Sequence, residues 1–450
     1  MKSRFVLVLL PLSLALTPLI LPTPASAIPA FSRQHKTECS TCHTIYPELN
    51  EFGDAFLKNG YVYPGKKQAA VAVKAGDAKG EAQEEQSRKS GGNEGLWLSG
   101  LPELLPVSFT GTVDVAYKND AGDGNKVDLS TRSLRLHAGG AFREAAGFFL
   151  TYNLYSQGPN SSVQTPANNA NVPSNNSPDI YELFAIWRQA LGSPVSLRVG
   201  RFEPKLSLWK TSNRAIRTPS YASTSYRVGN ELVHSPFSLD APEDAIELNA
   251  LLGNRVYLAG GVVDRNGQDR KDGYAHLSVK IGGTDFKGEE PEVDLEHDSI
   301  WDYLTVTLGG FGYLGSNGKT LADDKSGTTH NRNQFYRAGA ECDILYKRLH
   351  LKGSGVFGRD DNPDFNDSPV TQLLTHAYAF EGEYMFGAPV NLIAVLRYEY
   401  QEDATGGTRR YIPALVYAPL QNTKVSLQYN YSDAPREISR TTLASLAFSF

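Results

Sequence analysis

Five consecutive residues near the start of the chain carry the clearest chemical signal, Cys39-Ser40-Thr41-Cys42-His43. Two thiols separated by two residues can form thioether bonds to the two vinyl groups of one porphyrin. The histidine that follows can then bind the iron as its proximal ligand. The spacing therefore predicts one covalently attached haem c, held by Cys39 and Cys42, with His43 as the ligand of the haem iron.

A cysteine pair at this spacing can also belong to a zinc site or to a redox dithiol. A structural zinc site needs two further ligands nearby, and the third cysteine of the chain, Cys342, lies far away in sequence. A redox dithiol normally lies at a helix start in a βαβ unit, and no such pattern surrounds these residues. The spacing of the motif favours haem over both.

The residues after the motif predict one short amphipathic helix. Pro47 suits a first helical turn, and Leu49, Phe52 and Phe56 recur at helical spacing. An Asn-Gly pair at 59–60 is a typical helix end. A helix of about three turns is not stable alone. Its apolar face therefore needs a partner surface, for which the porphyrin is the first candidate and a barrel wall the second.

The first 27 residues predict a signal peptide for export. Two basic residues precede an apolar run, which ends in the small-residue cleavage site Ala25-Ser26-Ala27. A membrane span is the alternative, but prolines interrupt the run. No later apolar run approaches the ~20 residues of a membrane helix. The formal net charge of −5 argues against nucleic acid as a partner.

The remaining chain divides into three predicted parts. Residues 28–65 form the monohaem segment, a plug, and residues 66–103 form a flexible linker rich in Ala, Lys, Glu, Gln, Gly and Ser. From 104 to 450, segments of about ten residues alternate apolar and polar side chains. About sixteen such segments begin near residues 107, 131, 147, 180, 195, 244, 255, 273, 302, 333, 349, 373, 389, 409, 422 and 440.

Connections between these segments alternate in length. Short ones lie at 144–146, 347–348, 387–389 and 421–422, and long polar ones at 159–179, 206–243, 316–332 and 362–372. Outer-membrane barrels show this pattern, with short periplasmic turns and long external loops. A soluble β-sandwich is the alternative, but the signal peptide and the C-terminal aromatic residues favour the barrel. The predicted fold is mainly β: an outer-membrane antiparallel β-barrel of about 16 strands with a small N-terminal α-helical monohaem cytochrome c segment.

The period of two along a strand predicts which side chains face the lumen. Cys342 faces lipid by this argument and is assigned no chemistry. One long acidic connection, 284–301, falls on the short-turn side, where it is either a docking loop or a miscounted hairpin. The predicted lumenal residues are Arg135, His137, His276, Lys280, His350 and Lys352.

The sequence leaves several candidates for the sixth iron ligand. Met385 is the one methionine after the signal peptide, and it falls in a barrel strand that we expect to be remote from the haem. The candidates are His35, a lumenal histidine such as His137, or an open position. Arg33 is a candidate partner for a haem propionate, with an exposed arginine as the alternative.

About 35 residues of the N-terminal segment follow a pattern that resembles the fused monohaem c-type cytochrome–porins of the bacterial outer membrane. His35-Lys36 and Asp54 depart from that pattern. The resemblance implies oxidation of extracellular Fe(II). The matching residues are Pro29, Phe31, Arg33, Gln34, Cys39, Cys42, His43, Pro47, Leu49, Asn50, Phe52, Gly53, Phe56, Gly60 and Tyr61.

The combination of motif, barrel and resemblance predicts an outer-membrane electron conduit. The haem segment would lie in the periplasmic mouth or lumen, take electrons from extracellular Fe(II) or another donor, and pass them to a periplasmic cytochrome or other carrier. Such a protein would act as an Fe(II) oxidase. Acidic loop residues such as Asp360 and Asp364 would attract the cation. The alternatives are a porin with a haem-bearing plug, a small haem enzyme, and the same conduit running outward to an extracellular acceptor.

Overall fold

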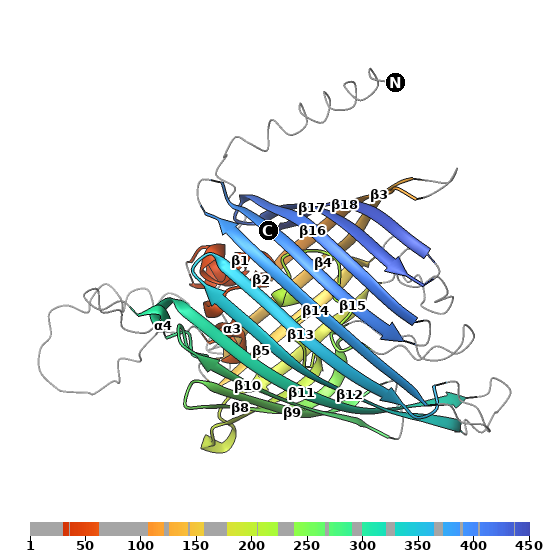
Figure 1. Ribbon diagram of the computed structural model, residues 1–450. Helices are drawn as coiled ribbons and strands as arrows, with labels where there is room; N and C mark the ends of the chain where they lie inside the picture. Colours follow the sequence, from red (N-terminus) through yellow and green to blue (C-terminus); the bar gives the residue numbers. More distant parts are fainter. Residues whose placement is uncertain are drawn as a thin grey trace, which may run out of the picture.

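Within the part of the chain that the structure describes, sixteen antiparallel strands form a closed barrel (Figure 1). Each strand pairs with its sequence neighbours, and the first pairs with the last. The strands are β3 (Val107–Lys118), β4 (Val127–Phe142), β5 (Ala146–Ser156), β6 (Asp179–Trp187), β7 (Val195–Phe202), β8 (Glu243–Leu252), β9 (Val256–Asp264), β10 (Asp272–Ile281), β11 (Leu304–Thr320), β12 (Thr329–Tyr346), β13 (Leu349–Asp360), β14 (Leu373–Phe386), β15 (Leu392–Asp403), β16 (Gly406–Leu420), β17 (Thr423–Ala434) and β18 (Glu437–Ser449).

The computed structural model describes residues 30–35, 37–62, 107–120, 126–142, 145–156, 178–204, 206–223, 238–265, 270–289, 299–320, 329–363, 372–387, 390–403, 406–435 and 437–450. The predicted signal peptide at 1–27 and nearly all of the predicted linker at 66–103 lie outside these residues. None of the described helices is both long and apolar enough to cross a membrane.

The predicted strand pattern is confirmed. Each of the sixteen predicted segments begins within four residues of an observed strand start. Short turns join the strands at one end, for example at 347–348 and 421–422. The long connection predicted at 316–332 is shorter than expected, because β11 and β12 extend to Thr320 and from Thr329.

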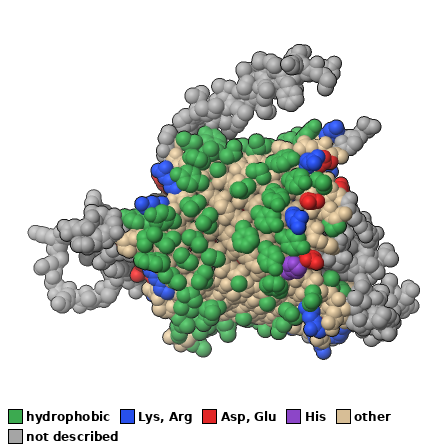
Figure 2. Space-filling view, in the orientation of Figure 1, with side chains coloured by type: hydrophobic (Ala, Val, Ile, Leu, Met, Phe, Trp, Pro, Cys, Tyr) green, Lys and Arg blue, Asp and Glu red, His purple; other side chains and the backbone are tan. Residues whose placement is uncertain are grey.

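The outer face of the barrel is apolar, as the alternation requires. Figure 2 shows hydrophobic side chains spread over the wall, with most charged side chains toward its edges. In β16, exposed Tyr411 and Leu415 alternate with buried Ile412 and Val416. An exposed apolar surface of this extent is typical of a wall that contacts lipid.

The inner face holds charged side chains in pairs. Each of five buried lumenal cations has a carboxylate oxygen within 3.1 Å. Low dielectric makes an unpaired charge costly, so the pairing offsets the cost of burying these charges inside the barrel. The pairs are Arg132–Asp114, Arg198–Glu247, Lys280–Glu51, Arg337–Asp360 and Arg397–Glu381.

Residues 206–223, here named the inward loop, fold into the lumen. The Leu208 amide donates to Glu341 Oε2 over 2.7 Å, and Arg397 Nη1 donates to the Thr218 carbonyl over 2.8 Å. Trp209 is fully buried. The expectation of a long external loop over 206–243 is therefore wrong for this stretch, because its apolar residues and backbone groups find partners on the lumenal wall.

Residues 30–62, here named the plug segment, also lie inside the barrel (Figure 1). The segment contains the helix α2 (Ala30–His35), a 3-10 turn η1 (Cys39–Thr41), the two-stranded ladder β1 (His43–Ile45) and β2 (Glu48–Leu49), and the helix α3 (Glu51–Lys58). It is therefore less helical than predicted. The helix expected to begin near Pro47 begins at Glu51, and Pro47 lies in the turn between β1 and β2.

The plug segment contacts the barrel wall on several sides. Lys280 of β10 lies 3.0 Å from Glu51, and the Cys39 amide donates to Gln421 Oε1 over 3.2 Å at the β16–β17 turn. Tyr61 stacks on Phe149 of β5 with ring centroids 5.5 Å apart. Because these partners lie at or toward the short-turn end of their strands, the plug segment occupies the lumen at that end.

The connection at 284–301 contributes to this docking. Asn59 Nδ2 donates to the Phe286 carbonyl over 3.2 Å, and Lys58 Nζ lies 4.3 Å from the centroid of the Phe286 ring. These contacts of Phe286, which lies in the described start of the connection, support a docking loop over a miscounted hairpin.

Candidate functional site

The Cys39–His43 motif forms one compact turn in the plug segment. Backbone bonds from Thr41 N to Glu38 O, 3.1 Å, and from Cys42 N to Cys39 O, 3.2 Å, close the 3-10 turn. His43 then begins β1. The turn therefore brings Cys39, Cys42 and His43 together within five residues of chain, which is the arrangement that thioether attachment and proximal ligation require.

His43 is held in a metal-binding tautomer. Its Nδ1 lies 3.3 Å from the Glu48 carbonyl oxygen. A carbonyl only accepts, so Nδ1 carries the proton and Nε2 keeps its lone pair. Burial lowers the pKa of His43 to about 4. The imidazole is therefore neutral at physiological pH, and neutral imidazole is the form that binds a metal.

The two thiols are not poised for redox exchange. Burial raises the pKa of Cys39 and raises that of Cys42 to about 11, whereas reactive dithiols have a depressed pKa. Among the described residues, no further histidine, cysteine or carboxylate gathers with Cys39 and Cys42 in a ligand cluster. The geometry therefore favours neither the redox dithiol nor the zinc reading.

Asn50 connects the motif to α3 through hydrogen bonds. Its Oδ1 accepts from the Gly53 amide over 2.9 Å, which caps the helix, and its Nδ2 donates to the carbonyls of Ser40 and Thr41 over 3.0 and 3.1 Å. The predicted helix start at Pro47 missed this role. The signal was present, since Asn directly before a helix is a typical N-cap.

Gly53 allows α3 to pack directly on the motif. A Cβ at this position would lie 2.0 Å from the Cys42 carbonyl oxygen and 2.9 Å from Leu49 Cδ2. Any side chain would therefore separate the helix from the cysteine turn. The close approach explains why glycine occupies a helical position, where it is otherwise unfavourable.

Glu48 links the motif to the barrel wall. Its backbone carbonyl holds His43, while its buried carboxylate pairs with Lys352 Nζ on β13. Lys352 also lies 2.7 Å from Glu383 Oε1 and 3.3 Å from Glu381 Oε1 on β14. The wall thus positions the residue that orients His43. Sequence reasoning placed Lys352 in the lumen, but it placed Glu48 in the first turn of the predicted helix, whereas Glu48 lies in β2 and faces the wall.

The other predicted haem contacts lie in different surroundings. His35 packs between aromatic rings, with its centroid 6.5 Å from Phe31 and 5.5 Å from Phe56. His137 faces the lumen as predicted, where its Nε2 lies 2.8 Å from Thr110 Oγ1 and its Nδ1 lies 3.1 Å from Thr151 Oγ1. Iron ligation by His137 would replace one of these hydrogen bonds. The side chain of Arg33 lies outside the described part of the chain. All three roles stay predictions.

Met385 lies closer to the plug segment than expected. It is in β14, as predicted, and packs against the apolar cluster that includes Ile45 of β1, two residues after His43. Met385 is therefore less remote from the plug segment than expected, and the expectation that it does not bind the haem iron stays a prediction. The strand was identified correctly, but the position of the plug against that strand could not be read from the sequence.

The barrel resembles solved outer-membrane channels. The anion-selective porin from Comamonas acidovorans has 11% identity and a TM-score of 0.51, with 76% of this chain and 99% of that chain covered. The outer membrane channel DcaP of Acinetobacter baumannii has 12% identity and a TM-score of 0.50, with 76% and 96% covered. At these identities the likeness shows the fold alone.

No curated protein matches the chain. A family match is nevertheless clear, because the family described as phosphate-selective porin O and P matches residues 108–359, more than half of the 450 residues. The matched stretch runs from β3 to β13 and so includes the inward loop. The chain therefore belongs to the phosphate-selective porin O and P family and has the barrel of an outer-membrane porin.

Proposed function

We propose that this protein is an outer-membrane porin-type barrel whose lumen carries a haem-bearing plug. The observation that carries the proposal is the Cys39–His43 turn inside the lumen, with the His43 Nδ1 proton fixed by the Glu48 carbonyl. The donor set fits a haem: two thiols one turn apart and a neutral imidazole. Cys39 and Cys42 would hold the porphyrin, and His43 Nε2 would bind the iron, which supplies one-electron chemistry.

The haem proposal predicts a change in the number of free thiols. Thioether bonds consume Cys39 and Cys42, so the denatured protein should present one thiol to an alkylating reagent, that of Cys342. Haem staining on a denaturing gel should be positive, and Cys39→Ala with Cys42→Ala should abolish it. Cys342→Ser serves as the matched control: it should remove the last alkylatable thiol and leave the stain unchanged. Three alkylatable thiols and an unstained wild-type band would exclude covalent haem.

Selective passage of anions is less well supported by the lumen. The family description names phosphate and one neighbour is an anion-selective porin, but the buried lumenal cations described above are matched by carboxylates. Arg410 likewise pairs with Glu399. Cations paired in this way do not concentrate anions as an unpaired cationic ring would. Lys424 is an exception among the described residues, because it donates to the Ala215 carbonyl and lies near Arg214 and Arg217. Because the plug segment also occupies the lumen, solute conduction is less well supported than the porin-type barrel.

The second candidate is the electron conduit, which the occupied lumen favours. The plug segment and the inward loop meet near Lys352, which contacts Glu48 and the Asn213 carbonyl. A barrel filled in this way suits electrons better than solutes, because electrons need a redox centre and not an open path. Extracellular Fe(II) remains the proposed donor and a periplasmic carrier the proposed acceptor, with outward flow as the alternative direction.

The position of Asp360 does not fit its expected role in attracting Fe(II). Asp360 was expected to attract cations from an external loop, yet it is fully buried and lies 2.8 Å from Arg337. Asp364 lies outside the described residues. Attraction of Fe(II) to the entrance is therefore not supported by Asp360, because its charge is already balanced inside the barrel.

The conduit predicts haem reduction from outside. In proteoliposomes with outward-facing loops, Fe(II) added externally without a permeant mediator should reduce the haem. His43→Ala should stop reduction while the barrel still assembles, because it removes the iron ligand and keeps both thiols. His276→Ala, which alters another lumenal imidazole, should leave the reduction rate unchanged. A wild-type haem that external Fe(II) never reduces at acidic or neutral pH would exclude Fe(II) as the donor.

A further inference from the structure

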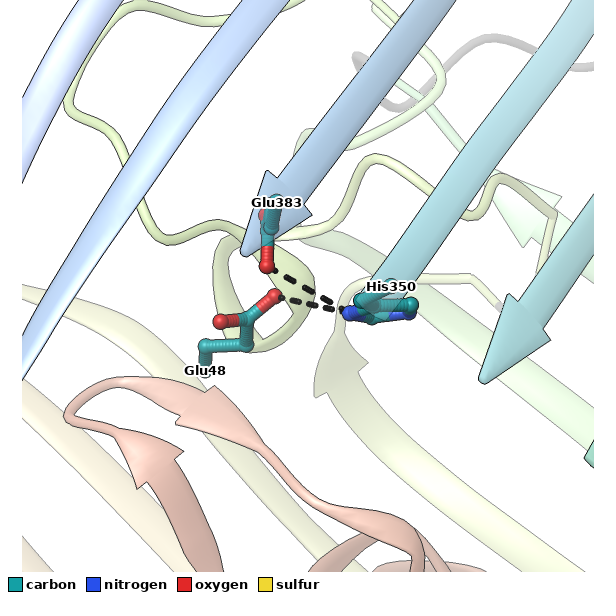
Figure 3. A group of neighbouring side chains, drawn as sticks. All are labelled: Glu48, His350 and Glu383. Atoms are coloured by element: carbon teal, nitrogen blue, oxygen red, sulfur yellow. Dashed lines mark ion pairs between the residues drawn. The ribbon is translucent and has the colours of Figure 1, made fainter. Parts of the chain in front are cut away.

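Three side chains from three different elements converge at the edge of the plug segment. Figure 3 shows Glu48 of β2 pointing from the plug toward His350 of β13 and Glu383 of β14. One ligand atom from each residue lies within 4.8 Å of the other two. Glu48 and His350 also line a cavity of about 120 Å³ between the plug segment and the wall, which gives a small ion access to the cluster.

The distances within the cluster suit an ion between the ligands. His350 Nδ1 lies 3.4 Å from Glu383 Oε2 and 3.7 Å from Glu48 Oε1. A charge-assisted N–H···O bond is shorter, roughly 2.7–2.9 Å. Bonds of roughly 2.1 Å to a tetrahedral metal place neighbouring ligand atoms roughly 3.4 Å apart. The spacing therefore matches metal ligands more closely than a direct ion pair.

Two further observations point to a bound cation. The other nitrogen of His350, Nε2, lies 2.7 Å from Asp343 Oδ1, which is the carboxylate contact that orients a metal-binding histidine. Glu48 is 1% exposed, and its Oε2 has no hydrogen-bond partner within the described structure. A buried carboxylate oxygen without a partner is costly, and a cation bound by both oxygens of Glu48 would satisfy it.

Lys352 sets the charge balance of the cluster. It contacts Glu48 Oε1 and lies 2.7 Å from Glu383 Oε1, so Glu383 Oε2 remains for a second cation, which would share Glu48 Oε1 with Lys352. The carboxylates of Glu48, Glu383 and Asp343 carry three negative charges, of which Lys352 balances one. Glu381 is balanced separately by Arg397 at 2.7 Å. Metal binding would displace a proton from His350, and the neutral imidazole, the three carboxylates and Lys352 would then leave two negative charges for the cation to balance.

We propose that Glu48, His350 and Glu383 bind one divalent transition-metal ion, which joins the plug segment to β13 and β14. Two carboxylates and one imidazole form a mixed O/N set suited to ions such as Zn²⁺, Fe²⁺ or Mn²⁺. Asp343 positions the imidazole of His350, and Lys352 contacts Oε1 of both Glu48 and Glu383. The site is separate from the haem-attachment turn and does not depend on haem.

Zinc binding tests the proposal on the full-length protein. After treatment with a chelator and its removal, the purified protein in detergent should bind one equivalent of Zn²⁺ per chain by equilibrium dialysis. His350→Ala and Glu383→Gln should each weaken binding by at least roughly 100-fold, and Asp343→Asn by roughly 10- to 100-fold. Zn²⁺ should also slow protease cleavage within residues 30–62, because the metal fastens the plug segment to the wall.

His276→Ala is the matched control. His276 lines the same cavity and lies 2.9 Å from Glu341, but it is not one of the three ligands. Its substitution should leave Zn²⁺ binding unchanged. The Cys39→Ala/Cys42→Ala protein should bind Zn²⁺ as well as wild type, so the outcome is independent of haem. Absence of a stoichiometric site, or equal loss of binding in His276→Ala and His350→Ala, would overturn the proposal.

Discussion

Deletion of residues 30–62 is expected to raise the single-channel conductance of the barrel by roughly tenfold or more, since sixteen-stranded porins enclose an aqueous channel. The plug segment contacts β5, β10, β13 and the β16–β17 turn, so its removal clears the short-turn end of the lumen. The inward loop then remains as the one described constriction. The measurement is conductance of the purified protein in planar lipid bilayers.

The deletion should also shift ion selectivity toward anions. It removes Glu48 and Glu51, which neutralise Lys352 and Lys280. Lys280 then faces an aqueous lumen without its partner, and Lys352 keeps two of its three carboxylate partners, both on β14. A lumen with added positive charge conducts anions preferentially. Reversal potentials measured across a salt gradient report this change directly.

The matched control keeps the plug and removes only the thioether sites. The Cys39→Ala/Cys42→Ala protein should stay closed, because every wall contact of the plug segment named above comes from other side chains or from the backbone. If the deletion variant conducts no better than wild type, the inward loop closes the barrel by itself. If the double cysteine variant conducts as well as the deletion, haem and not the polypeptide fills the passage.

Replacement of Lys352 by methionine is expected to destabilise the folded protein by roughly 3–5 kcal/mol, the usual cost of leaving buried charge without its partner. The side chain of Lys352 is fully buried and faces Glu48, Glu381 and Glu383. Methionine fills a similar volume but leaves three carboxylates without the ammonium. The free energy of unfolding in guanidinium measures the effect. Protease cleavage within residues 30–62 should increase, because Glu48 loses its main contact with the wall.

Lys271→Met is the control for loss of a lysine charge. Lys271 lies 2.8 Å from Asp264, but both side chains are more than 40% exposed. Such surface pairs contribute about 0–1 kcal/mol, so this variant should unfold almost as wild type does. Similar destabilisation by the two substitutions would show that the cluster around Lys352 does not anchor the plug segment.

The barrel could be predicted closely from the sequence because its signal is local and repeated. The alternation of apolar and polar side chains in strands such as β16 identifies the inner and outer faces. Each two-residue turn marks where the next strand begins. Arg135, His137 and Lys352 could be placed in the lumen from the period of two alone. A one-residue error would have moved each of them to the lipid face.

The contents of the lumen could not be predicted in the same way. Residues 206–223 belong to a long connection, as an external loop does, and only contacts such as Thr218 with Gln428 show that they turn inward. Glu48 and Lys352 are 304 residues apart, and the sequence around either residue gives no sign that the two are in contact. The Cys39–His43 motif was visible because its chemistry lies within five residues, whereas its anchoring depends on partners across the barrel.

The seam between the first and last strands has a consequence for biogenesis. Phe109 and Phe450 exchange two backbone hydrogen bonds, of 2.7 and 2.9 Å, where β3 meets the C-terminal end of the chain. The ring thus closes only when β18 pairs with β3, yet the plug segment precedes β3 in the chain. Once the ring is shut, the wall surrounds the plug segment, and Cys39 is already buried. If residues 30–62 carry the proposed haem, its attachment is therefore expected before the barrel closes, so export, haem attachment and membrane insertion would follow in that order.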